Sequence, residues 1–427
     1  MNVPKLEKEI GIKVYATHST GIGGLLRKSP EDFVVEEILK DGSKAQIDAP
    51  VVQHVGGRGR YLVCVLVKRD FDTLLAVRAI AHKLGIDSER IQIAGIKDTH
   101  ALTAQHVSIG RMLPEDVANL RLNNLRLYPL GFSNEKIHTN MLFGNYFRVT
   151  VRALCHSSSE IMKQMENVHN ELQELGGCPN FYGHQRFGTT RPVTHLVGKN
   201  ALLGDLEKAA LTFLAKPSPD ERLESRRARE QLWSSQNYEE ALGHFPRRLV
   251  YEREMLIHLA KRSRDFVGAF HRLPKKLCQL FVQGYQSYLF NKFLSKRIQQ
   301  GLPLRNAQQG EHKLIVDGQE YLALPQIGYK QAFSAGEQGD IEKEILGKEG
   351  VTLQNFRVSA VPEMSSPGGL RVALTPVIGL NIEKPKEDNS DSERLMAKLR
   401  FSLRRGSYAT ILLREFMKPR DPLKSGF

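Results

Sequence analysis

The kind of secondary structure that the sequence favours changes along the chain, and this change constrains the fold more than any other feature. The first ~150 residues alternate between strand-like and helix-like segments. Residues 200–300 are mostly helical and rich in charge, and residues 313–375 return to short strands and turns. With 427 residues, 41% of them hydrophobic, the chain is long enough for one to three domains. It is neither disordered as a whole nor a collagen-like or coiled-coil rod.

Local periodicity predicts individual elements in the first part of the chain. Residues Ser158–Leu175 repeat apolar side chains at steps of four and three and end at Gly176, which is typical of an amphipathic helix. Residues Asp72–Leu84 open with a capping aspartate and stop at Gly85, which predicts a shorter helix. Strands are predicted at Phe33–Ile38, Tyr61–Val67, Ile91–Gly95 and Asn145–Arg152.

Two segments near the C-terminus have a different character. Residues Lys384–Glu393 are polar and carry no periodicity, which predicts a linker. Residues Leu399–Lys418 are strand-like again.

The charge balance indicates the class of partner. Lysine and arginine number 61 and aspartate and glutamate 47, so the net charge is +14. An excess of this size suggests a polyanion, most often a nucleic acid, although a basic surface that only aids solubility is the simpler alternative.

Two features of the sequence bear on the cellular location of the protein: its four cysteines and its lack of long apolar runs. Cys64, Cys155, Cys178 and Cys278 form no CxxC pair and are too few for a disulfide scaffold. The first residues contain no apolar segment of the signal-peptide kind, and the longest apolar runs have only strand length. We therefore expect a cytoplasmic protein with no membrane partner.

Asp98 is the first candidate for chemistry. It follows a short apolar strand, lies on a turn that begins at Gly95, and neighbours Lys97. Nearby cations would keep its carboxylate ionised, and therefore nucleophilic or basic. An aspartate that only caps a turn or a helix is the simpler alternative.

Two further segments combine aromatic and polar residues. Asn145 and Phe147 precede a strand, and the ring could receive an extruded base or could simply be a core residue. Asn180–Gly188 holds Gln185 and Arg186 between glycines, a composition that suits a phosphate and a stacked base, or a structural turn.

Metal and nucleotide-cofactor sites are not expected. The fourteen histidines show no HExxH or paired spacing. The glycine-rich segments Gly21–Gly24 and Gly56–Gly59 are not followed by the Lys-Ser/Thr of a phosphate loop.

In this order, the candidate segments resemble the TruD family of tRNA pseudouridine synthases. The sequence AGIKDTHALTAQ, around Asp98, resembles the family's catalytic signature, Gly-x-Lys-Asp followed by Ala-x-Thr-x-Gln. The resemblance extends from about Gly24 to Phe416 and includes GNYF, PNFYGHQRFG, YQSYLFN and GSYATILLRE. Two positions depart from the family pattern: Arg27 stands where lysine is frequent, with Lys28 beside it, and Asn140 stands where glycine is frequent.

The resemblance implies a fold and a domain arrangement. The fold is α/β, with a catalytic domain built on a mixed, mostly antiparallel sheet from residues 1–176 and 383–427. An inserted α/β TRUD domain would span residues 177–382.

The resemblance also implies a reaction, the isomerisation of uridine 13 of tRNA to pseudouridine without a cofactor or metal. Asp98 would be the nucleophile and would attack C1′ of the ribose or C6 of the uracil, or assist a glycal route. The tRNA would be the partner of a monomeric enzyme. Its expected substrate-binding residues are Phe147, Asn145, Arg27, Lys28, Lys97, Arg186, Gln185 and Asn180. A catalytically silent tRNA-binding protein or RNA chaperone of the same fold is the alternative.

Overall fold

The computed structural model describes residues 2–48, 59–118 and 120–427, so most of the segment Gly56–Gly59 lies outside the described residues. The chain forms two compact units. The helical unit comprises Met1–His18, Glu174–Leu374 and Arg420–Leu423, and the sheet unit comprises Ser19–Gln173, Thr375–Pro419 and Lys424–Phe427. The borders of the TRUD domain, 177–382, stay a prediction.

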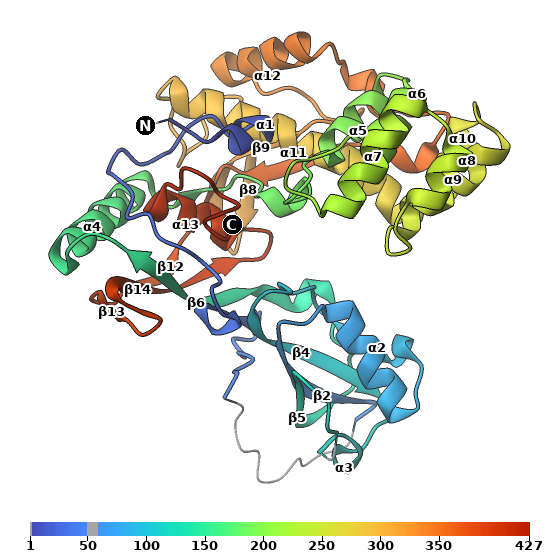
Figure 1. The fold of residues 1–427 in the computed structure, drawn as a ribbon. Helices are drawn as coiled ribbons and strands as arrows, with labels where there is room; N and C mark the ends of the chain where they lie inside the picture. The colour runs from blue at the N-terminus through green and yellow to red at the C-terminus, as the bar shows by residue number, and fades with distance from the viewer. Residues whose placement is uncertain (1, 49–58, 119) are drawn as a thin grey trace. The chain divides into compact units, whose positions relative to one another are not determined.

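The sheet unit is built on one sheet that has nine strands among the described residues (Figure 1). Its order is β12-β14-β6-β1-β4-β2-β5, with β13 beside β14 and β3 beside β4. In this sheet β1 and β4 pair in parallel and the other described pairs are antiparallel. The predicted mixed, mostly antiparallel sheet is therefore confirmed. The strands are β1 (Phe33–Leu39), β2 (Tyr61–Arg69), β3 (Ile91–Ile93), β4 (Leu102–Gly110), β5 (Leu125–Ser133), β6 (Leu142–Leu154), β12 (Ile378–Ile382), β13 (Lys386–Asp388) and β14 (Asp391–Arg404).

The predicted helices of the sheet unit form where their sequence signals place them. Asp72 caps α2 (Thr73–Leu84) by accepting hydrogen bonds from two backbone amides, and Gly85 ends the helix with φ of 66°, a conformation that favours glycine. The buried face of α2 packs against apolar side chains of β2 and β4. In α4 (Ser158–Leu175) the predicted apolar stripe is buried. The unit also contains α3 (Pro114–Ala118).

The predicted linker is wrong. Residues Lys386–Asp388 form β13, which pairs with β14 through a turn at Asn389 and Ser390. The buried Asp388 carboxylate accepts hydrogen bonds from the backbone amide and hydroxyl of Ser390 and from Arg152. Polar residues that bond one another can make an ordered turn, which a composition-based prediction cannot distinguish from a linker.

The strand-like prediction for Leu399–Lys418 holds only in its first part. After β14 the chain forms α13 (Ala409–Met417), and every residue of this helix is buried. The short apolar run Ile411–Leu413 cannot be told from a core strand by periodicity alone, and this explains why the sequence did not predict the helix.

The helical unit is organised around the 25-residue helix α11 (Lys275–Gln299), much of which is buried. Helix α5 packs against α11 so closely that a Cβ at Gly198 would collide with the carbonyl of Phe281. The prediction of strands and turns over 313–375 missed one helix, α12. The other elements are α1 (Lys5–Glu9), α5 (Thr194–Leu202), α6 (Leu206–Ala215), α7 (Leu223–Ser235), α8 (Tyr238–His244), α9 (Val250–Lys261), α10 (Phe266–Phe270), α12 (Gly336–Glu349), β7 (Cys178–Pro179), β8 (Lys313–Val316), β9 (Gln319–Gln326), β10 (Gly369–Val372) and β11 (Leu374–Thr375).

The lengths and compositions of the described helices bear on whether they could span a membrane. None of them combines the length and the apolar character that crossing a membrane requires.

Candidate active site

Asp98 lies in the loop between β3 and β4, and hydrogen bonds from two neighbouring elements hold that loop. Thr73, at the start of α2, accepts a hydrogen bond from the Lys97 amide (3.1 Å) and donates one to the Lys97 carbonyl (3.2 Å). Gln105 of β4 donates to the carbonyl of Gly95 (3.0 Å). The Asp98 side chain remains 36% exposed. The backbone is thus fixed while the carboxylate stays accessible.

Arg27 forms an ion pair with Asp98. Its Nη2 lies 3.2 Å from Oδ1 of Asp98, its Nη1 donates to the carbonyl of Gly426 (2.9 Å), and its guanidinium carbon lies 4.1 Å from the ring centre of Phe33. Its backbone has φ of 55°, which few residues other than glycine adopt. Burial lowers the pKa of Arg27 below its usual value, and the Asp98 charge opposes that shift. The pair is therefore held in one geometry from several sides.

Lys97, although next to Asp98, lies against a different carboxylate. Its Nζ forms an ion pair with Oε2 of Glu37 (2.6 Å) and donates a hydrogen bond to Oδ1 of Asn145 (2.8 Å). The side chains of Lys97 and Glu37 are only 3% and 0% exposed. Burial raises the pKa of Glu37, but hydrogen bonds from His106 and the Lys97 charge outweigh it and hold the pKa below its usual range. Lys97 and Asn145 thus brace the loop.

Lys68, at the end of β2, was not predicted as a site residue. Its side chain is fully buried, and its ammonium donates to the backbone carbonyl of Asp98. Burial lowers the pKa of Lys68 to about 8, while the charges of Asp98 and Asp72 oppose the shift. A lysine directly after the apolar run Tyr61–Val67 is the signal in the sequence that could have identified it.

The lowered pKa of Lys68 predicts a pH dependence of stability. Its usual pKa is near 10.5, and in the folded protein it is about 8. Below about pH 8 the folded protein carries the full cost of the buried ammonium, and this cost disappears as the pH rises to about 10.5, because only the folded state releases the proton in that window. Lys68 should therefore make the free energy of unfolding rise with pH.

Denaturant unfolding across this pH range checks the prediction. The difference in unfolding free energy between Lys68→Met and the parent should change between about pH 8 and 10.5, and be constant at lower pH. The exposed Lys83 of α2 offers a control, Lys83→Met, whose difference should stay constant throughout. A constant difference for Lys68→Met would contradict the assignment.

Phe147 has a packing role in the structure. Its side chain is 4% exposed, and its ring stacks on Phe401 (5.3 Å between centres) and meets the edge of Phe33 (6.1 Å). Stacking of a base on Phe147 would require this ring to be uncovered, and it stays a prediction. Lys28 is exposed, on the segment that carries Arg27.

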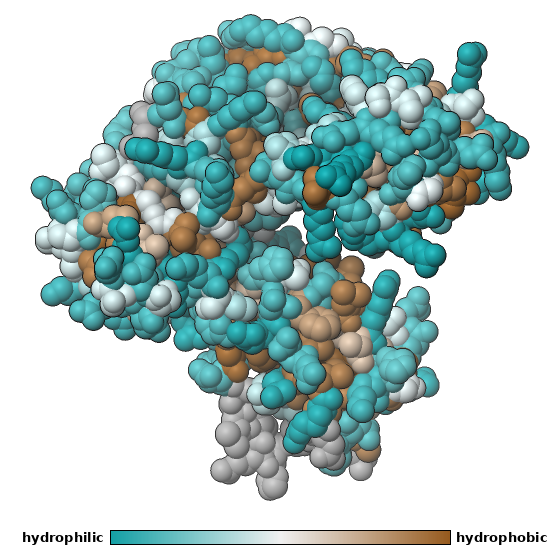
Figure 2. Space-filling model, in the orientation of Figure 1, coloured by the Kyte–Doolittle hydropathy of each residue, from teal (hydrophilic) through white to brown (hydrophobic). Residues whose placement is uncertain are grey.

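Apolar side chains are exposed beside the Asp98 loop. Ile96 is 65% exposed, and Leu74 and Leu75, which follow the loop-binding Thr73, are 50% and 54% exposed. Figure 2 shows hydrophobic residues at the surface in the region of α2. This surface offers apolar contact next to an accessible carboxylate.

The other predicted substrate-binding residues belong to the helical unit. Arg186 donates from Nε to Ser287 (3.2 Å) and from Nη2 to Gln283 (3.1 Å). Asn180 is buried and accepts a hydrogen bond from Arg371 at its Oδ1 (2.6 Å). Gln185 is exposed.

The structure brings together only part of the predicted set. In the sheet unit, Arg27, Lys97, Asp98 and Asn145 meet, together with Glu37 and Lys68, which the sequence did not single out. No group of three or more histidine, cysteine or acidic side chains that could hold a metal ion occurs among residues 2–48, 59–118 and 120–427. The cluster is suited to chemistry because it holds a carboxylate in a fixed place beside positively charged side chains.

Comparisons with known proteins identify the family. The family model described as tRNA pseudouridine synthase D (TruD) matches residues 9–319 and 306–416. A protein of Methanosarcina barkeri described as "Probable tRNA pseudouridine synthase D" is 39% identical over 99% of this chain and 100% of its own length. One of Methanopyrus kandleri with the same description is 41% identical over 85% of this chain and 86% of its own. A crystal structure of a protein described as tRNA pseudouridine synthase D from Methanosarcina mazei has a TM-score of 0.85 and 37% identity, and the match covers 99% of this chain and 100% of that one. The chain therefore belongs to the tRNA pseudouridine synthase D (TruD) family.

Proposed function

We propose that this protein isomerises uridine 13 of tRNA to pseudouridine, with Asp98 as the nucleophile. The observation that carries the proposal is the Arg27–Asp98 pair, in which an accessible carboxylate on a braced loop is held by a partly buried guanidinium. Membership of the family gives the reaction class. The match to the family's signature supports Asp98 as the reacting group.

The reaction balances without a cofactor. The C1′–N1 bond of the nucleotide breaks, the uracil turns, a C1′–C5 bond forms, and the proton lost from C5 is matched by one gained at N1. No electron or external group is transferred. Asp98 forms a transient adduct at C1′ or C6, or assists a glycal route, and is released at the end of the cycle.

The residues around Asp98 take separate roles in this proposal. Arg27 orients the carboxylate through the ion pair at 3.2 Å and places a positive charge beside the reacting group. Lys97 braces the loop through its contacts with Glu37 and Asn145 and acts as a positioning residue. The exposed apolar side chains of Leu74, Leu75 and Ile96 suit the faces of an unstacked base.

The helical unit supports binding of the tRNA in this proposal. The inserted TRUD domain, residues 177–382, includes most of the helical unit, and Arg186 orders the Asn180–Gly188 segment through its bonds to Gln283 and Ser287. The exposed Gln185 and Lys28 contact the RNA. The enzyme acts as a monomer in the cytoplasm.

The function is tested with tRNA transcripts that differ at one nucleotide. The transcript with uridine 13 should acquire a carbodiimide-dependent stop in primer extension at that position after incubation with the protein. The matched transcript with cytidine 13 should acquire none, because only uridine is the substrate.

Two outcomes would contradict the proposal in different ways. A stop at another uridine in both transcripts would support the pseudouridine synthase activity but contradict uridine 13 as its target. Tight binding of both transcripts without any stop would favour the silent tRNA-binding alternative.

A further inference from the structure

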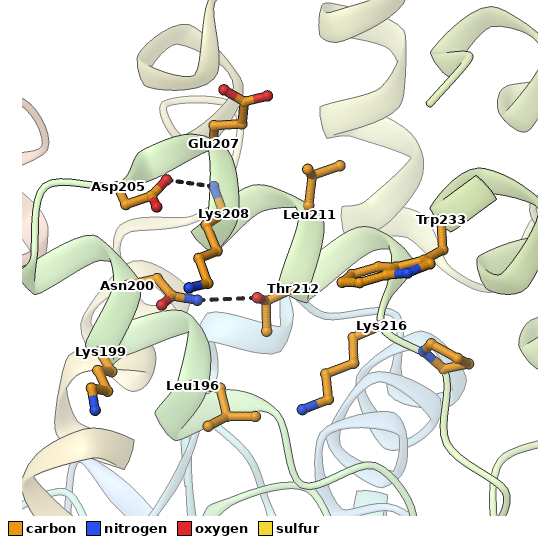
Figure 3. Close-up of a pocket in the computed structure, with 11 residues that line it drawn as sticks. Leu196, Lys199, Asn200, Asp205, Glu207, Lys208, Leu211, Thr212, Lys216 and Trp233 are labelled. Carbon is orange, nitrogen blue, oxygen red and sulfur yellow. Dashed lines mark hydrogen bonds between the residues drawn. The ribbon is translucent and has the colours of Figure 1, made fainter. Parts of the chain in front are cut away.

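A hollow of about 840 Å³ lies among helices α5, α6 and α7 of the helical unit (Figure 3). Its volume is within the ~300–1,000 Å³ range of pockets that hold small ligands or single groups of larger ones. None of its lining residues belongs to the Asp98 cluster. The hollow is therefore a different site from the Asp98 cluster.

The aromatic wall of the hollow is Trp233, the single tryptophan of the chain. Its side chain is 54% exposed, whereas its neighbour Leu232 on α7 is fully buried in the core. Figure 3 shows the indole projecting into the space between Leu211 and Lys216. A half-exposed indole that borders a hollow offers a flat face on which a base can stack.

Three lysines, Lys199, Lys208 and Lys216, also line the hollow. Lys199 is neutralised by Glu349, at 2.7 Å. Among the described residues, no carboxylate lies within ion-pair distance of Lys208 or Lys216, and both side chains are exposed. Two ammonium groups thus remain to attract an anion.

The two acidic residues at the hollow do not cancel this charge. Asp205 accepts a hydrogen bond from the backbone amide of Lys208 (2.9 Å), which assigns its carboxylate to capping α6. Figure 3 shows the Glu207 carboxylate directed away from the other lining side chains. Polar contacts inside the hollow come from Asn200 and Thr212, which are hydrogen-bonded to each other at 3.1 Å.

We propose that this hollow binds one unpaired nucleotide of an RNA strand, with its base stacked on Trp233 and its phosphates at Lys208 and Lys216. The combination of an aromatic face with cations is the one that single-stranded nucleic acid uses. A strand is favoured over a free nucleotide because the whole chain carries a charge of +14, which suits a long polyanion. The identification of that strand as tRNA rests on the proposed function.

Trp233 supplies its own probe, because the chain has no other tryptophan. Unmodified tRNA transcript should quench the intrinsic indole fluorescence in a saturable way. The double variant Lys208→Gln/Lys216→Gln should shift this titration to roughly tenfold higher RNA concentration. The charge-matched control Lys276→Gln/Lys330→Gln, made at exposed lysines outside the hollow, should shift it much less.

A second measurement follows the RNA instead of the protein. In filter binding, Trp233→Ala should weaken tRNA affinity roughly tenfold, and Trp233→Phe should restore most of it because a ring can still stack. Equal affinity of the Ala variant and the parent would overturn the proposal. So would tRNA that binds in this assay and leaves the fluorescence unchanged.

Two further outcomes separate this proposal from others. If uridine monophosphate quenches the indole fluorescence as well as tRNA at equal concentration, the hollow is a site for free nucleotides, and the proposal that it binds an RNA strand is overturned. Quenching by tRNA that persists in Asp98→Asn, together with loss of pseudouridine formation, supports both proposals. Quenching by tRNA in a parent protein that forms no pseudouridine would support the hollow and contradict the proposed function.

Discussion

Asp98→Asn should reduce pseudouridine formation by about 10³-fold or more, because removal of a nucleophile eliminates the covalent route rather than weakening it. The amide keeps the shape of the side chain and can still accept a hydrogen bond from Arg27, but it carries no charge. Since the carboxylate is 36% exposed, solvent screens the ion pair, and the free energy of unfolding should change by no more than about 1 kcal/mol. Primer extension on the uridine 13 transcript measures the first effect and denaturant unfolding the second.

Asp87→Asn is the matched control for this variant. Asp87 is exposed and caps the short helix Ser88–Arg90 by accepting a hydrogen bond from the Glu89 amide at 2.7 Å, a role that asparagine also fills. This control should retain full activity and stability. If Asp98→Asn keeps substantial turnover, or fails mainly by unfolding, Asp98 is a turn residue and the catalytic assignment is withdrawn.

Much of the fold could be predicted because its signals are local. The cap at Asp72 and the glycine at 85 fix the two ends of α2 within the helix itself, and the stripe of α4 records which of its faces is buried. Helix α13 was not predicted in this way, because its short apolar run Ile411–Leu413 fits a core strand as well as a helix. Its structure depends on contacts that are distant in sequence.

The candidate site shows the same limit. Asp98 could be found from its own neighbours, since glycine, lysine and a preceding strand are adjacent to it in the sequence. Glu37, the partner of Lys97, could not be found in this way, because the pairing of β1 with β4 and β6 brings it close to Lys97 from a distant part of the sequence. The signal available for Glu37 was a charged residue within a mostly apolar strand. The signal for Lys68 was a charged residue directly after an apolar run.

The buried pair between Glu37 and Lys97 leads to the largest expected effect on stability. Glu37→Gln leaves the Lys97 ammonium, 3% exposed, without a counter-charge, and the loss of one partner of such a pair costs about 3–5 kcal/mol. Because whole domains are stable by only about 5–15 kcal/mol, this variant should melt at a much lower temperature. Since the pKa of Glu37 is held below its usual range, the stabilisation is present at neutral pH and is lost only in acid.

Two comparison variants distinguish this pair from an ordinary ion pair. Glu36→Gln, one residue earlier on β1, removes a carboxylate whose partner Lys44 is 32% exposed and can be hydrated, so it should cost only about 1 kcal/mol. The double variant Glu37→Gln/Lys97→Met removes both buried charges and should recover much of the stability lost in Glu37→Gln. Thermal and denaturant unfolding of the three variants measure these differences. If Glu37→Gln costs no more than Glu36→Gln, or the double variant recovers nothing, the Glu37–Lys97 charge pair does not hold the Asp98 loop in place.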